Sequence, residues 1–243
     1  MAKNFRLYIK EELILQKTII LNEEQTHYLK NVVKYATGET INCFDNKNGE
    51  FKCQIIELNK KTTKIVPLEK TKDRVSCPDI WLLFAPLKKD NTDFVIEKAT
   101  ELGCSKIIPV LTAYTNTTNF KTERHLAQSI EAAEQCRRTD LPEISHLQPL
   151  TDIINQWDPS RTLFFMDETL QSKNFLDVLK TNKTNRAAIL IGPEGGFSAE
   201  ELSLVRKQSY TKGATLGPRI LRAETAALAA LSCWQLIQGD WRI

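Results

Sequence analysis

Apolar and polar residues alternate with a period of two through much of the first third of the chain, which is the pattern of half-buried β-strands. This pattern predicts strands over residues 5–9, 40–44, 51–58 and 63–68, with a hairpin turn containing Asn48-Gly49 between the second and the third. One helix is predicted to begin at Asn22, with an apolar stripe at helical spacing formed by Tyr28, Leu29, Val32 and Val33. The pattern therefore predicts a small β-rich unit with a single helix.

The pattern changes after residues 71–78, a polar stretch that ends in Pro78 and is typical of a linker. We therefore predict two domains, residues 1–72 and residues 73–243. In the second, apolar runs alternate with helical patterns. The runs lie at residues 80–85, 106–111, 163–166, 187–191 and 214–216, and the helices at 92–102, 123–138, 174–179, from Ser198 onward, and 224–238. Strands that alternate with helices predict an α/β domain, a mostly parallel sheet with helices on its faces.

The composition narrows the class of protein. Hydrophobic residues make up 42% of the 243 residues and charged residues 26%, which is typical of a soluble globular protein. No apolar run reaches the roughly 18 residues of a membrane helix, and the N-terminus has no secretory signal pattern, so we predict a cytoplasmic protein without membrane contact. The six cysteines show no C-x-x-C pair, so we predict no bound metal.

The glycines gather near the end of the chain. Five of the nine lie at positions 192, 195, 196, 213 and 217, around two Gly-Pro pairs that each follow an apolar run and lead into a helix. Ser198 is the predicted N-cap of the helix after the first pair. Glycine allows close approach of the backbone and proline fixes the loop shape, so the pattern indicates two stiff loops that bind a small molecule through backbone groups. Two ordinary tight turns are the alternative interpretation.

These loops carry a resemblance to a known family. Residues 191–196, Ile-Gly-Pro-Glu-Gly-Gly, and residues 216–226, Leu-Gly-Pro-Arg-Ile-Leu-Arg-Ala-Glu-Thr-Ala, resemble the two cofactor loops of SPOUT methyltransferases. Together with residues 5–8, 97–103 and 131–137, they resemble the ribosomal RNA small subunit methyltransferase E family, which methylates N3 of a uridine in 16S ribosomal RNA. The resemblance covers nearly the whole chain.

The resemblance implies a PUA-like β-barrel domain that binds RNA, followed by a SPOUT domain with a deep trefoil knot. It also implies S-adenosylmethionine as cofactor, a homodimer whose interface forms the site, and 16S ribosomal RNA as partner, in a small-subunit particle. The expected cofactor contacts are Met166, Ile191, Gly192, Pro193, Glu194, Gly195, Gly196, Leu216, Gly217, Ile220 and Leu221.

The expected catalytic residues are Arg222 and Glu224. Loss of the N3 proton leaves negative charge on the uracil, and Arg222 is a cation that can stabilise this charge. Glu224 can orient Arg222, face the sulfonium, or act as a base if its pKa is raised. It can equally be a carboxylate that stabilises a helix N-terminus. Arg222 has an alternative role as a surface or interface residue, and Glu194 one as an acceptor that shapes its loop.

Positive charge is concentrated in the first third. Residues 1–72 carry 13 Lys and Arg against 9 Asp and Glu, whereas the whole chain has a net charge of +3. The expected RNA contacts are Arg6, Lys88, Lys89 and Arg137. A lysine-rich solvated surface explains the charge equally well, and Arg137 lies near a helix C-terminus, where cations are favoured for local reasons.

Other classes of protein fit less well. The phosphate-binding G-x-x-x-x-G-K-[ST] motif of nucleotide hydrolases is absent, and no G-x-G-x-x-G follows an early strand. Two alternatives stay open. One is a SPOUT enzyme that acts on another RNA nucleotide. The other is a non-catalytic RNA-binding protein, which would not bind S-adenosylmethionine.

Overall fold

The computed structural model describes residues 5–169 and 171–241, apart from the side chain of Lys89. The chain forms two compact units. The first contains Met1–Ser76 with Ala133–Leu141, and the second Cys77–Ala132 with Pro142–Ile243. The first unit thus includes a short segment, 133–141, that comes from within the predicted second domain. The predicted boundary between residues 72 and 73 stays a prediction.

The first unit is built on one five-stranded sheet with the order β1-β3-β4-β5-β2. Its strands are β1 (Arg6–Tyr8), β2 (Ile19–Leu21), β3 (Thr40–Asp45), β4 (Gly49–Leu58) and β5 (Thr63–Lys72). β1 pairs with β3 in parallel, and the other pairs are antiparallel. β2 was not predicted, because its residues, Ile19–Leu21, are all apolar and show no alternation. β5 continues through the first two residues of the predicted linker.

The helix of this unit begins as predicted. Asn22 accepts the backbone N–H of Gln25, whose side chain in turn accepts the N–H of Asn22, so α1 (Glu23–His27) starts in a capping box. The chain continues as a π-helical turn, η1 (Tyr28–Val32). Of the predicted apolar stripe, Leu29 is buried but Tyr28 and Val32 are exposed. The reason is that a turn with i→i+5 bonds does not keep the 3.6-residue spacing that the prediction assumed.

The second unit contains a seven-stranded sheet with the order β12-β10-β11-β6-β7-β8 and with β9 beside β7. Its strands are β6 (Ile80–Phe84), β7 (Lys106–Leu111), β8 (Glu143–Ile144), β9 (Gln148–Pro149), β10 (Thr162–Met166), β11 (Ala187–Ile191) and β12 (Thr211–Ala214). Each of these pairings is parallel, which confirms the predicted sheet.

The position of the last strand was predicted wrongly. β12 covers Thr211–Ala214 rather than residues 214–216. Gly213 lies within the strand, opposite Phe165. A Cβ atom at Gly213 would lie 2.8 Å from the Phe165 ring, so this glycine is needed for close packing rather than for a turn.

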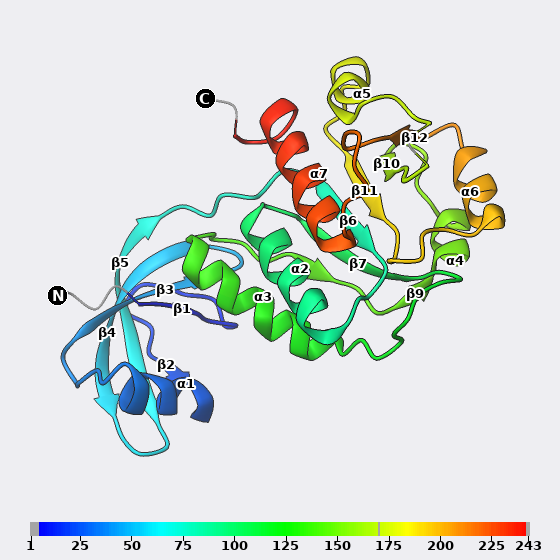
Figure 1. The fold of residues 1–243 in the computed structure, drawn as a ribbon. Coiled ribbons are helices and arrows are strands. Elements are labelled where there is room, and N and C mark those ends of the chain that lie inside the picture. The colour runs from blue at the N-terminus through cyan, green and yellow to red at the C-terminus, as the bar shows by residue number, and fades with distance from the viewer. Residues whose placement is uncertain (1–4, 170, 242–243) are drawn as a thin grey trace. The chain divides into compact units, whose positions relative to one another are not determined.

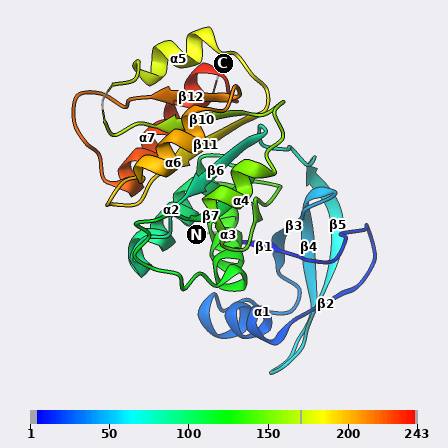
Figure 2. The same cartoon turned by 90° about the vertical axis from the view of Figure 1, so that its right-hand side faces the viewer.

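Helices cover both faces of the sheet, as predicted (Figures 1 and 2). They are α2 (Lys89–Glu101), α4 (Leu150–Asn155), α5 (Phe175–Thr181), α6 (Ala199–Arg206) and α7 (Ala223–Ile237). A further helix, α3 (Thr122–Cys136), ends in segment 133–141 of the first unit. α2, α5 and α7 share one core with Leu82 and Ile189, whereas α4 and α6 share another with Leu83 and Leu190. Consecutive strand residues therefore face opposite layers, and both faces of the strands are apolar.

The strand order brings the ends of three strands together. β10 lies between β11 and β12, all three parallel, so the loops that follow them leave the same edge of the sheet. Ligands of open α/β sheets bind at this carboxyl edge.

Among the described residues, no helix is long and apolar enough to span a bilayer. The strand order alone does not test the implied trefoil knot, which stays a prediction.

Candidate active site

A cavity of about 230 Å³ lies in the second unit at the carboxyl edge of β10, β11 and β12. Arg222 lines this cavity. The expected cofactor contacts that line it are Met166, Ile191, Gly192, Pro193, Glu194, Leu216, Ile220 and Leu221. Gly195, Gly196, Gly217 and Glu224 are not among the lining residues. The two predicted loops thus meet at one cavity.

The glycines of the first loop leave room for neighbouring side chains of the protein. Gly196 has a φ of +73°, and its N–H donates to the carbonyl of Pro193 at 3.0 Å. A Cβ atom at Gly196 would lie 1.7 Å from Oε1 of Glu168, and one at Gly192 would lie 2.9 Å from the Phe197 ring. These glycines shape the loop, and the close approach of its backbone to a ligand stays a prediction.

The loop leads into a well-capped helix. Ser198 accepts the N–H of Glu201 at 3.2 Å and Glu201 accepts the N–H of Ser198 at 2.9 Å, so the predicted N-cap is present as a capping box. The other carboxylate oxygen of Glu201 accepts the N–H of Ala113 at 2.8 Å. The buried Glu201 therefore fixes the start of α6 to the loop after β7.

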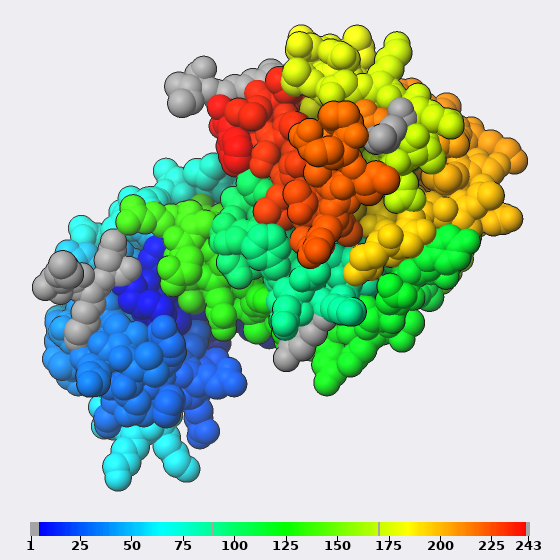
Figure 3. Space-filling view, viewed as in Figure 1, coloured from blue at the N-terminus to red at the C-terminus, as the bar shows by residue number. Residues whose placement is uncertain are grey.

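The second loop presents backbone donors. Among the residues that the structure describes, none accepts a hydrogen bond from the N–H groups of residues 216, 217 and 219–221. Gly217 has a φ of +112°, with no atom within 4 Å of the position of an added Cβ. The segment that contains this loop, orange in Figure 3, reaches the surface, and Ile220 is 75% exposed.

Arg222 and Glu224 stand in different surroundings. Arg222 is the exposed N-cap of α7 and, within the described ranges, forms no ion pair. Glu224 accepts a hydrogen bond from Nδ2 of Asn91 at 3.3 Å. The structure does not bring the two side chains together as an ion pair, so orientation of Arg222 by Glu224 is not supported. Glu224 instead lies in the first turn of α7, which fits the alternative of a helix N-terminal carboxylate.

Two acidic residues after β10 were missed. Asp167 and Glu168 both line the cavity. Burial raises the pKa of Asp167, but hydrogen bonds from Ser172, Thr169 and Arg206 outweigh it, so the pKa is lowered. Burial and the charge of Asp167 raise the pKa of Glu168, against the opposing effect of the Phe197 N–H. Their position directly after a buried strand was the available signal.

Comparison with known proteins agrees with this arrangement. An RNA methyltransferase domain family matches residues 75–235, and an RNA methyltransferase PUA domain family matches residues 21–68. The chain is 32% identical to the ribosomal RNA small subunit methyltransferase E of Buchnera aphidicola subsp. Schizaphis graminum, over 97% of each chain. The chain belongs to the ribosomal RNA small subunit methyltransferase E family.

Solved structures of similar proteins share the fold along the whole chain. The family member of Neisseria gonorrhoeae, bound to S-adenosyl methionine, has a TM-score of 0.88 at 27% identity, with 98% of this chain and 99% of that one covered. A Legionella pneumophila methyltransferase with bound cofactor has a TM-score of 0.89 at 28% identity, with coverage of 98% and 100%. The predicted α/β methyltransferase domain after a PUA-like domain is thereby confirmed.

In this protein, the side chains of the expected RNA contacts differ in exposure. Arg6 is buried, and its guanidinium donates to Glu50 at 2.5 Å and to the carbonyls of Ala133 at 2.9 Å and Arg138 at 2.8 Å. This placement removes Arg6 from the candidate phosphate contacts. The alternation of residues 5–9 suggested an outward side chain, but segment 133–141 covers that face of β1.

The other expected RNA contacts keep their candidacy or lie outside what is described. Lys88, the N-cap of α2, and Arg137, just after α3, are exposed. The side chain of Lys89 lies outside the described residues. In the part of the chain that the structure describes, no cluster of three His, Cys, Asp or Glu residues could hold a metal ion.

Proposed function

We propose that this protein transfers the methyl group of S-adenosylmethionine to N3 of a specific uridine in 16S ribosomal RNA. The observation that carries the proposal is the guanidinium of Arg222 on the rim of the two-loop cavity, without an acidic partner among the described residues. The family to which the chain belongs supports the class of substrate.

The cavity suits S-adenosylmethionine by its chemistry. Apolar side chains of Met166, Ile191, Leu216 and Leu221 would hold the adenine, and the N–H groups of the second loop that have no acceptor in the described chain would bind its polar edges. The bound cofactor in the Neisseria and Legionella structures supports this assignment. When bound, S-adenosylmethionine supplies an electrophilic methyl group on a positively charged sulfur.

Arg222 would act on the other reactant. Uracil N3 carries a proton, and its loss leaves negative charge shared by N3, O2 and O4. A guanidinium that no carboxylate neutralises can stabilise this charge, and the positive end of the α7 dipole adds to the same effect. The target base must be unpaired or flipped out, because N3 lies on its Watson–Crick edge.

RNA binding and assembly are parts of the same proposal. The PUA-like unit, in which residues 1–72 carry a net positive charge, would contact phosphates, together with the exposed Arg137 of segment 133–141 and Lys88 of the second unit. We infer a homodimer that works on the small-subunit particle in the cytoplasm. Support for the dimer comes from exposed apolar side chains at the second loop and α7, Ile220 and Leu236.

The test uses radiolabelled S-adenosylmethionine with two substrates, free 16S ribosomal RNA and small subunits, both from a strain without the modification. Mass spectrometry of nuclease fragments then locates the methyl group. A methyl group at N3 of one uridine supports the proposal, whereas methylation of another nucleotide points to a different SPOUT activity. Calorimetry that detects no binding of S-adenosylmethionine would leave only the RNA-binding alternative.

A further inference from the structure

The carboxylate of Glu168 occupies the space that a side chain at residue 196 would need. An added Cβ at Gly196 would lie 1.7 Å from Oε1 and 2.7 Å from Cδ of Glu168. Gly196 also has a left-handed φ of +73°, and the α-hydrogen that a Cβ would replace points toward this carboxylate. Glu168 follows β10 and Gly196 follows β11, two adjacent parallel strands, so the contact joins the ends of both.

The same carboxylate reaches both the loop and the cavity. Its oxygen lies against Gly196, the Phe197 backbone N–H opposes the rise in the Glu168 pKa, and Glu168 lines the cavity beside Gly192 and Pro193. Glu168 as a residue is exposed, but its carboxyl group lies against the loop. We propose that Glu168 is a positioning residue whose carboxylate holds the turn at residues 195–197 in the shape that binds S-adenosylmethionine. This inference rests on the proposed function.

The neighbouring carboxylate of Asp167 does not contact the loop in this way. Asp167 accepts hydrogen bonds from Thr169 and Ser172, both at 2.6 Å, and pairs with Arg206 at 3.1 Å. Glu168 forms no ion pair within the described part of the chain. Its carboxylate is therefore available to the loop backbone, whereas that of Asp167 is occupied.

Protonation would weaken this contact. Burial and the negative charge of Asp167 raise the pKa of Glu168, so the ionised form is lost at a higher pH than for a solvated glutamate, whose pKa is about 4.3. The other charged groups around the cavity are Glu194, Arg219 and Arg222, with Arg206 paired to Asp167. Affinity for S-adenosylmethionine should therefore decrease in mild acid, and Glu168→Gln should remove the part of this decrease that Glu168 causes.

The first measurement is the calorimetric affinity of the full-length protein for S-adenosylmethionine. If the wild-type protein does not bind it, the proposed function fails and the role of Glu168 fails with it. If the wild-type protein binds, four variants test Glu168 alone: Gly196→Ala, Glu168→Ala, their double variant, and Gly38→Ala. The last is a matched control, because Gly38 has a φ of +93° but no neighbour within 4 Å of an added Cβ, and it lies in the first unit, outside the cavity.

We expect Gly196→Ala to weaken binding about tenfold more than Gly38→Ala, because only the former has the clash with the carboxylate. In the double variant the clash is absent, so its loss should be clearly smaller than the product of the two single losses. Losses that simply multiply, or a Glu168→Ala variant with wild-type affinity, would overturn the proposal and leave the proposed function standing.

Glu168→Gln separates positioning from folding. It keeps the size of the side chain and a polar oxygen toward the loop but cannot ionise, so it should bind at neutral pH nearly as well as wild type but with a flatter pH profile. Glu200→Gln, at an exposed carboxylate in the first turn of α6, should keep the wild-type profile. Equal profiles for wild type and Glu168→Gln would contradict the proposal, and thermal melting shows which variants fold.

Discussion

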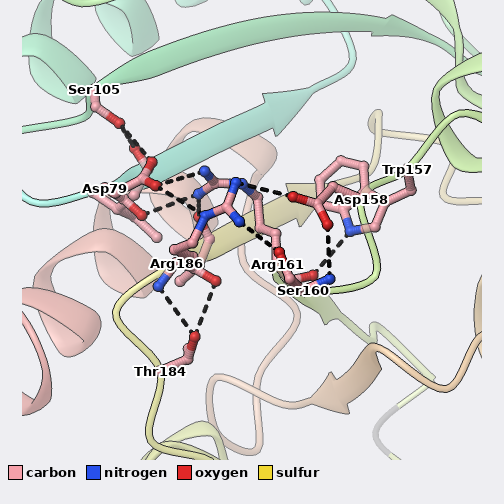
Figure 4. A network of polar contacts seen from close by, with 10 residues as sticks. Asp79, Ser105, Trp157, Asp158, Ser160, Arg161, Thr184 and Arg186 are labelled. Carbon is pink, nitrogen blue, oxygen red and sulfur yellow. Dashed lines mark hydrogen bonds and ion pairs between the residues drawn. The ribbon is translucent and has the colours of Figure 1, made fainter.

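The guanidinium of Arg161 donates through Nη2 to the carboxylate of Asp79 at 2.6 Å (Figure 4). Arg161 directly precedes β10 and Asp79 directly precedes β6, so the pair lies at the amino edge of the sheet. Arg161 also donates to the carbonyls of Asp79 at 3.1 Å and Ala187 at 3.0 Å, and it lies 3.6 Å from the centroid of the Trp81 ring. One buried side chain therefore links the starts of three strands.

Replacement of Arg161 by Met should destabilise the second unit. Arg161 is 2% exposed, and its loss leaves two carbonyls and one carboxylate without this donor. We expect the free energy of unfolding to fall by roughly 2–4 kcal/mol in denaturant titrations. Arg186→Met is the matched control, because Arg186 also pairs with Asp79 but its side chain is 48% exposed. Its cost should stay below about 1 kcal/mol, and equal costs would contradict the interpretation.

The pH dependence of stability should report the same pair. Burial raises the pKa of Asp79, but the hydrogen bond and charge of Arg161 and the charge of Arg186 outweigh it, so the folded-state pKa is lowered. A lowered pKa stabilises the fold above the unfolded value of about 3.9, and this stabilisation is lost as the pH falls through the folded value. The difference in unfolding free energy between wild type and Arg161→Met should therefore shrink below about pH 4. A difference that is constant from pH 7 to pH 3 would show that Asp79 contributes nothing to it.

The sequence patterns predicted the two loops of the site, but they did not predict the long-range contacts that hold the fold around it. The two loops could be found because Gly-Pro pairs after apolar runs are local features. Arg161 and Arg6 could not be recognised as buried, since their partners are distant in the chain: Asp79 for Arg161, and segment 133–141 for Arg6. The start of β12 was missed for the same reason, because Gly213 packs against Phe165 of another strand.

Arg222→Ala should lower kcat and spare cofactor affinity. If Arg222 stabilises the uracil anion, its removal should reduce kcat by about 10²–10³, as for the loss of one stabilising donor elsewhere. Affinity for S-adenosylmethionine should stay nearly unchanged, and Arg222→Lys should recover part of the rate because it keeps the charge. Single-turnover rates and calorimetry measure the two effects. A variant that loses cofactor affinity in proportion to rate would make Arg222 a cofactor contact instead.

Arg6 should matter for stability and exposed cations for RNA. The side chains of Arg6 and Glu50 are 6% and 4% exposed, and Arg6→Met leaves the buried Glu50 carboxylate with only Lys72 at 3.4 Å as an ion-pair partner, so it should cost roughly 2–4 kcal/mol. Lys88→Ala and Arg137→Ala should instead leave stability unchanged and each reduce the salt dependence of RNA binding by about one phosphate contact. An unaltered salt slope in both variants would place the RNA surface elsewhere.

The homodimer should depend on the outward side of α7. Its apolar composition is explained in part by its own unit, since Ala230, Leu231 and Trp234 are buried there, and Trp234 is therefore not available to a partner. Leu236 is 57% exposed and remains available for the interface.

Leu236→Glu should give monomers of 27.7 kDa in light scattering, with reduced methyl transfer, whereas wild type should have about twice that mass. Leu176→Glu, at a leucine of α5 that is 39% exposed, should leave the dimer intact. Wild-type protein that is monomeric at micromolar concentration with full methyl transfer would rule out a functional dimer, because each site would then be complete within one chain.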